Sequence, residues 1–97
     1  MIEQEIISDV ADIYGITVDN ILSHRRLRKY VDARSVICYL LCAVRGITTT
    51  EVGDMLNRTH ASVIHLRRNG ENWQRCPMLN KRGACAINEL KKRYDSN

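Results

Sequence analysis

The chain has 97 residues, 44% of them apolar, and its 15 lysines and arginines against 11 aspartates and glutamates give a net charge of +4. This length allows one domain and excludes a large catalytic module joined to a second domain. The apolar fraction is enough for one modest core, which excludes a disordered tail. Apolar runs are short and flanked by charge, and the N-terminus is acidic, so we expect no membrane-spanning segment, no secretory signal and a cytoplasmic protein.

Helical spacing begins near the N-terminus. Ile6, Val10 and Ile13 share one face of a predicted helix, and Gly15 follows as a helix stop. Thr17 is placed to cap a second, short helix. That helix leads directly into a run of basic residues.

A buried helix is predicted next. Asp32 is placed at its N-cap, and residues 35–45 have almost no polar face before the chain reaches Gly46. A helix that is apolar all round belongs in the middle of a small bundle. Beyond it, Thr48 and Glu51 have the spacing of a capping box, which opens another short helix.

Two further helices complete the pattern. The short helix breaks at Asn57, and Thr59 is placed to cap the next helix, which we expect to end before Gly70. A polar stretch then leads to a last helix over residues 84–94. Strand-type alternation is almost absent. The sequence therefore predicts an all-α fold, a small helical bundle.

Residues 48–68 have the pattern of a helix-turn-helix, with a short capped helix, a break of about three residues and a second helix. In this motif the second helix enters the major groove of DNA, and its N-terminal residues face the bases. The residues at that position are Thr59, His60, Ala61 and Ser62. Their hydroxyl, imidazole and methyl groups suit base edges, and Arg67 and Arg68 are placed further along to meet phosphates.

The charge distribution also favours a nucleic-acid partner. Residues 1–20 hold five acidic residues and no lysine or arginine, whereas residues 21–97 hold 15 basic and six acidic residues, a net charge of +9. Such a field favours nucleic acid or an anionic membrane surface, and a solvated basic face without a partner is the alternative.

Neither a metal site nor a catalytic site is predicted. Cys38 and Cys42 have metal-ligand spacing but lie in an apolar segment, and Cys76 and Cys85 are too far apart to form a second pair. We therefore expect buried, reduced thiols and no cofactor. The histidines lack metal-pair spacing, and no phosphate-binding loop or activated nucleophile is present, so the protein is not expected to be an enzyme.

Three stretches resemble the C-terminal DNA-binding domain of the bacterial replication initiator DnaA. Residues 10–26 resemble its opening, and the similarity continues through Arg28, Ala33, Arg34 and the buried helix to residues 50–56. Residues 58–65 resemble the family signature Arg-Asp-His-Thr-Thr-Val-Leu-His. The similarity extends over residues 3–70 and implies a helix-turn-helix bundle of the DnaA C-terminal, Trp repressor-like type.

The resemblance implies a role for each matching group. The counterpart of Arg34 inserts into the minor groove, the basic residues around Arg26 lie along the DNA backbone, and the signature residues around His60 read the major groove. Guanidinium groups suit both phosphate and a narrow minor groove. The expected DNA-contacting residues are Arg25, Arg26, Arg28, Arg34, Thr48, Thr59, His60, Ala61, Ser62, His65, Arg67 and Arg68.

The chain departs from the family pattern at three places. Thr59 replaces the signature aspartate, Ala61 replaces a threonine, and Asn57 stands in place of paired glycines in a turn that is one residue shorter. These changes preserve the fold but bear on recognition of the initiator's own DNA box. The initiator's ATPase module is not in this sequence, so we expect a stand-alone domain.

We therefore predict a DNA-binding domain over residues 1–70 and a C-terminal helical extension over residues 71–97 that packs on it, with Trp73 covering the core. The predicted function is sequence-specific binding of double-stranded DNA by a monomer in the bacterial nucleoid, in replication or transcription control. The protein is expected to belong to a bacterium or to one of its mobile elements, such as a phage. The alternative is a helical interaction module that binds a replication protein or an RNA.

Overall fold

The computed structural model describes residues 2–95, and no strand occurs among them. The longer helices are α1 (Ile2–Tyr14), α3 (Arg28–Tyr39), α5 (His60–Arg75) and α6 (Lys81–Tyr94). The shorter elements are α2 (Val18–Leu22), α4 (Thr49–Leu56), the π-helical turn η1 (Leu40–Val44) that continues α3, and the 3₁₀ turn η2 (Pro77–Leu79). The predicted all-α bundle is confirmed.

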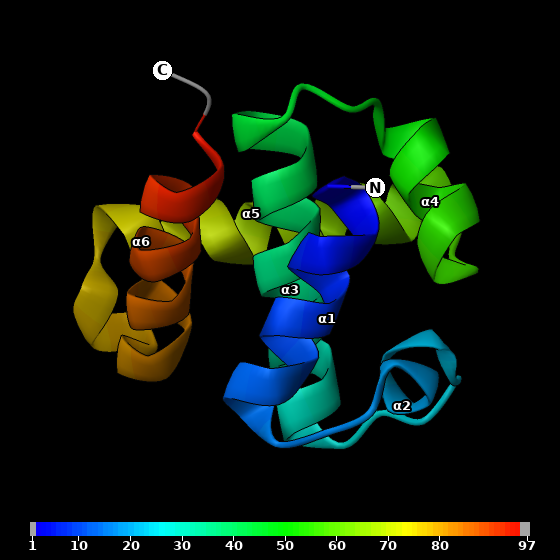
Figure 1. Cartoon of the computed structure of the whole chain (residues 1–97), viewed down its shortest axis with the longest axis horizontal. Helices are drawn as coiled ribbons and strands as arrows, with labels where there is room; N and C mark the ends of the chain where they lie inside the picture. The colour runs from blue at the N-terminus through cyan, green and yellow to red at the C-terminus, as the bar shows by residue number, and fades with distance from the viewer. Residues whose placement is uncertain (1, 96–97) are drawn as a thin grey trace.

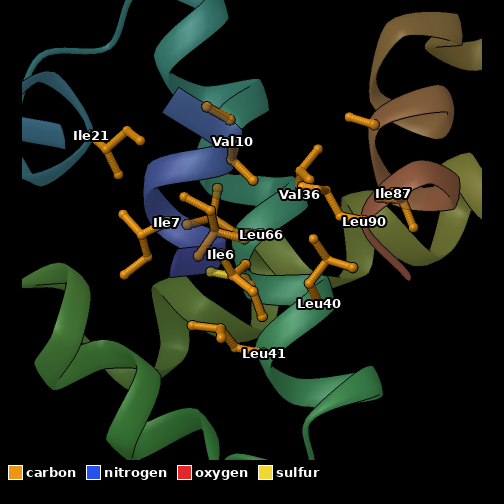
Figure 2. Packing of buried hydrophobic residues seen from close by; sticks show 14 of the residues in the cluster. Ile6, Ile7, Val10, Ile21, Val36, Leu40, Leu41, Leu66, Ile87 and Leu90 are labelled. Carbon is orange, nitrogen blue, oxygen red and sulfur yellow. The ribbon is translucent and has the colours of Figure 1, made fainter. Parts of the chain in front are cut away.

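The central helix is α3, against which α1, α2, α5 and α6 all pack (Figure 1). α5 crosses α3 and connects α4 on one side of the molecule with α6 on the other (Figure 1). Figure 2 shows side chains from α1, α3 and α6 converging between these helices. Ile6, Val10, Val36 and Leu90 are fully buried there.

The predicted caps of α2 and α4 and the predicted stop after α1 are confirmed. The Thr17 hydroxyl accepts from the Asn20 amide at 3.0 Å and thereby caps α2. Thr48 and Glu51 form the reciprocal capping box at the start of α4. Gly15 follows α1 with a φ of +65°, a backbone conformation that glycine adopts without steric cost.

α3 begins four residues before the predicted cap. Its first residue is Arg28, its N-cap is Leu27, and Asp32 lies one turn inside the helix. Local rules disfavour this start, because basic residues oppose the helix dipole and Leu27 has no side-chain acceptor. Burial of Tyr30 and Ala33, which are 6% and 0% exposed, stabilises the extra turn.

α5 continues through Gly70 to Arg75, so the prediction that it ends before residue 70 is wrong. Gly70 lies where α5 crosses α3, because a Cβ atom at this position would be only 2.5 Å from the Cβ of Tyr39. The neighbouring Asn69 side chain donates to the Ser35 hydroxyl of α3 at 3.2 Å. Glycine here allows close helix packing, and the predicted domain boundary at residue 70 falls inside α5.

The C-terminal segment packs on the bundle through Trp73. This side chain is 9% exposed, and a Cβ atom at Gly83 would be 2.5 Å from its ring, so α6 lies directly against the indole. The predicted cover over the core is confirmed. Asn80 caps α6 by accepting from the Gly83 amide at 2.8 Å, and α6 therefore begins at Lys81, three residues before the predicted start.

The four cysteines differ in burial, and Cys42 is half-buried. Cys38 is buried, and burial raises the pKa of its thiol. Cys76 and Cys85 are exposed, so the prediction of buried thiols is wrong for them, because both face outward from the C-terminal segment.

Within residues 2–95 no group of three potential ligands is placed to hold a metal ion. Across the same residues, no helix has the length and apolarity to cross a bilayer.

Candidate nucleic-acid interface

Residues 23–29, here called the basic loop, join α2 to the first turn of α3. Arg25, Arg26 and Arg28 are exposed there, and the Arg28 side chain remains 87% exposed although its Nε lies 3.7 Å from Asp32. The first amide groups of α3 have no side-chain cap. An uncapped helix N-terminus beside arginines is a favourable environment for a phosphate group.

The turn between α4 and α5 has the geometry of a helix-turn-helix. Asn57 ends α4 with a φ of 58°. Asparagine is, besides glycine, one of the few residues that adopt this left-handed conformation. A Cβ atom at Gly53 would be 2.6 Å from the carbonyl oxygen of Arg58, so the turn lies directly on the α4 backbone. Glycine at position 53 therefore allows the turn to pack closely on α4.

The predicted base-contacting residues come together at the start of α5. Thr59, His60 and Ala61 are exposed, and Ser62 is half-buried. The Thr59 hydroxyl accepts from the Ser62 amide at 3.2 Å, which confirms Thr59 as the cap. His65 is exposed one turn later on the same helix. This end of α5 presents hydroxyl, imidazole and methyl groups to solvent.

The other predicted contact residues lie further from this end. Arg68 is exposed, whereas Arg67 is half-buried and pairs with Glu71 at 3.4 Å within α5. Thr48 lies at the opposite end of α4, and its hydroxyl donates to Glu51 at 3.0 Å. The structure therefore does not bring Thr48 to the turn, and it gives Arg67 a protein partner.

Arg34, which the resemblance places in the minor groove and the predicted cap at Asp32 would put at the start of the buried helix, lies inside the protein. Since α3 begins at Arg28, Arg34 falls in the second turn and is only 3% exposed. Its Nε donates to the Ile21 carbonyl at 2.7 Å, and its Nη2 donates to the carbonyls of Asn20 at 3.1 Å and Ser23 at 2.8 Å. Arg34 therefore caps the carbonyl end of α2.

Arg58 is a residue of this interface that the sequence reasoning did not assign. It is half-buried in the turn before α5, and its Nη2 donates to the Ser23 carbonyl at the start of the basic loop. Its Nη1 donates to the carbonyls of Leu56 at 3.3 Å and Asn57 at 3.1 Å. The available signal was its place as the first residue of the resembling signature.

A cleft of about 360 Å³ lies between the basic loop and α5. Its lining residues are His24, Arg26, Val31, Arg34, Arg58, Ser62, His65 and Leu66, and no carboxylate is among them. Burial, followed by the cations of Arg58 and Arg26, lowers the pKa of Arg34. Arginines nonetheless remain charged in proteins, so the cleft is positively charged and suited to an anion.

Comparison with known proteins agrees with this geometry. Residues 3–69 match the family described as "Bacterial dnaA protein helix-turn-helix". The chain is 28% identical over 94 residues to the chromosomal replication initiator protein DnaA of Thermosipho africanus (strain TCF52B), a match that covers 97% of this chain and 20% of that protein.

Other relatives match over shorter stretches. The chromosomal replication initiator protein DnaA of Ureaplasma parvum serovar 3 is 36% identical over 63 residues, which are 64% of this chain and 14% of that protein. The DnaA 2 protein of Chlamydia caviae is 34% identical over 59 residues, which are 61% of this chain and 13% of that protein. This chain therefore spans one fifth or less of the length of these relatives.

Proposed function

Because the chain belongs to the bacterial DnaA helix-turn-helix family, we propose that it binds double-stranded DNA with sequence specificity. One observation carries this proposal: the basic loop and the exposed start of α5 form the two sides of one cleft without carboxylates. Positive charge without counter-charge favours a polyanion. An exposed helix start beside it has the size that the major groove accepts.

The two sides of the cleft suit different parts of a duplex. With the start of α5 in the major groove, the basic loop lies against the adjacent backbone and minor groove. Arg25, Arg26 and Arg28 then contact phosphates, which position the protein without reading sequence. His60 and Ser62 face base edges and supply the discrimination.

The chain's own residues favour a target that differs from the DNA box of the initiator. Thr59 replaces a carboxylate that can accept from cytosine, and its hydroxyl also caps α5. Ala61 offers a methyl group in place of a hydroxyl, which suits contact with the methyl group of thymine. Both changes lie at the exposed start of α5, where the bases are read.

The names of the relatives point to the biological setting. They are chromosomal replication initiator proteins, and we propose that this chain acts in the control of replication or of transcription. It acts by binding rather than by catalysis, without a cofactor, as a monomer in the bacterial nucleoid. A replication protein is a further candidate partner.

Salt dependence tests the proposal most directly. If Arg25, Arg26, Arg28 and Arg68 each neutralise one phosphate, the logarithm of affinity should fall against the logarithm of salt concentration with a slope of roughly −3.6. Engagement of Arg67, after it leaves Glu71, would steepen the slope to roughly −4.5. A slope near zero for every duplex contradicts the proposal.

A mobility-shift competition separates DNA binding from the alternative. Sites are first selected from a random duplex pool, and the bound duplex is then challenged with scrambled duplex, single strands and structured RNA. We expect the selected duplex to resist all three competitors. Preferential displacement by RNA would instead support the interaction module.

A further inference from the structure

The basic loop and the helix-turn-helix are tied together at a single atom. The carbonyl oxygen of Ser23 accepts from Arg34 of α3 and from Arg58 of the turn before α5. Arg34 also holds the carbonyls of Asn20 and Ile21, so it fixes the end of α2 from which the loop starts. We call this arrangement of Arg34, Ser23 and Arg58 the arginine clamp. It sets the separation between the two walls of the cleft.

The arginine clamp concentrates positive charge without counter-ions. Arg26, Arg34 and Arg58 line the same cleft, and His24 and His65 add imidazoles to its lining. The ion pairs found in residues 2–95 all lie elsewhere: Arg28–Asp32, Arg67–Glu71, Arg93–Asp9 and Arg93–Glu89. Three guanidinium groups gathered around one cleft repel one another, and an anion between them offsets this repulsion.

The placement of the cleft identifies the anion. One wall is the basic loop and the other is α5, and under the proposed function these elements lie against adjacent grooves of the duplex. The structure that separates two adjacent grooves is a sugar-phosphate backbone. The His65 imidazole on α5 supplies a donor suited to phosphate oxygens, and Arg26 supplies donors from the opposite wall.

We propose that this cleft seats one phosphodiester of one DNA strand, and that Arg58 is the positioning residue that holds the two walls at the separation this phosphate requires. The proposal rests on the proposed function, since it needs a bound duplex. It adds that one backbone position dominates the phosphate contacts and that the minor-groove and major-groove elements act as one rigid unit.

The experiment is a scan of a selected duplex in which each phosphate in turn is replaced by a neutral methylphosphonate. We expect one position to lower affinity by about 10- to 100-fold, the range for a lost hydrogen bond to a charged group. Other positions should change affinity less. The Arg26→Gln variant, altered only at an exposed side chain, should reduce the effect of that one position.

Arg58→Gln tests the positioning role. It should flatten the scan so that no phosphate dominates, whereas Arg75→Gln, roughly 24 Å away at the other end of α5, should leave the scan unchanged. If Arg58 only supports the fold, Arg58→Gln should lower the affinity for every duplex of the scan by the same factor. The same phosphate should then remain dominant. Arg58→Lys keeps the charge but lacks the forked donors, and it provides the same readout if Arg58→Gln does not fold.

The possible outcomes separate this proposal from the proposed function. Duplex binding with a uniform scan overturns the phosphate seat and leaves DNA binding intact. Absence of binding to any duplex overturns both. Inorganic pyrophosphate is titrated in parallel by NMR of the His24 and His65 side chains. Tight pyrophosphate binding together with a uniform scan would assign the cleft to a free phosphate ligand and overturn its assignment to a DNA phosphate.

Discussion

The two ends of α5 lie in opposite surroundings. Around His60, side chains are exposed, and the nearby cleft contains arginines and no carboxylate. At the other end, Trp73 is buried against α6, and Arg93 of α6 pairs with Asp9 of α1 at 3.1 Å. The exposed groups proposed to contact DNA lie at the start of α5, here called the binding end, and Trp73 anchors the other end, here called the stabilising end. Val63 and Leu66 add buried core contacts on the inner face of the first half. Substitutions of the exposed groups and of Trp73 should therefore have separable effects.

The largest expected effect is at the stabilising end. Trp73→Ala removes a buried indole and leaves a cavity beside Gly83, so it should lower the free energy of unfolding by about 3–5 kcal/mol. The measurement is urea denaturation, with the exposed Arg75→Ala as the control. At temperatures where the variant is folded, its preference for the selected duplex should be unchanged. A lost preference there would break the separation between the two ends.

The next effect is at the binding end. His60→Ala and Ser62→Ala should each cost roughly 1–3 kcal/mol on the selected duplex and little on a scrambled one. Their unfolding free energy should stay within about 0.5 kcal/mol of the parent value, because neither group holds the core. Arg25→Ala is the comparison variant and should weaken both duplexes equally. Equal losses on both duplexes for His60→Ala and Ser62→Ala would show that α5 does not read bases.

Tyr14, which ends α1, and Tyr94, which ends α6, provide a finer comparison among the stabilising groups. The Tyr94 hydroxyl donates to the Asp9 carboxylate, whereas the Tyr14 hydroxyl is buried without a partner among the described residues. Tyr94→Phe should lower the unfolding free energy by about 0.5–1.5 kcal/mol. Tyr14→Phe should leave it unchanged or raise it, because no hydrogen bond is lost.

Alkaline pH distinguishes Tyr14 further. Burial, with a smaller contribution from Asp32, raises the pKa of Tyr14 from 10.0 to about 12. The folded state therefore holds this proton more tightly than the unfolded state, and stability falls as the pH rises from 10.0 to about 12. In Tyr14→Phe the decline over this range should be shallower. Identical pH profiles for parent and variant would contradict the raised pKa.

The smallest expected effect is that of metal removal. Because no three potential ligands converge within residues 2–95, neither end of α5 should depend on zinc. The melting temperature should be the same with and without chelator, and purified protein should contain no stoichiometric zinc. One ion per chain, with a lower melting temperature in chelator, would contradict this expectation.

Local signals in the sequence predicted much of the fold. Thr17, Thr48 and Thr59 each cap a helix as predicted, because a cap depends only on residues within one turn. The exposed start of α5 followed from the same signals. The resemblance to the DnaA family contributed the basic loop and is supported by the family match over residues 3–69.

Features that depend on contacts between distant residues could not be predicted. Gly70 has the local character of a helix end, but its place at the crossing with Tyr39 keeps it inside α5. The early start of α3 depends on burial of Tyr30, and that start places Arg34 inside the protein. Arg58 holds a carbonyl 35 residues away, a contact that no local pattern indicates.

Because α5 crosses α3 at Gly70, a change in the crossing angle would displace the start of α5. His60, at the start of α5, lies about 15 Å along the helix axis from Gly70. Trp73 lies much closer to Gly70, on its other side. A tilt of about 5° at Gly70 moves the start of α5 by roughly 1.3 Å, which exceeds the tolerance of a hydrogen bond to a base edge. The close contact between Gly70 and Tyr39 limits such a tilt, so a change in packing around α6 should reach the start of α5 only if it disturbs this crossing.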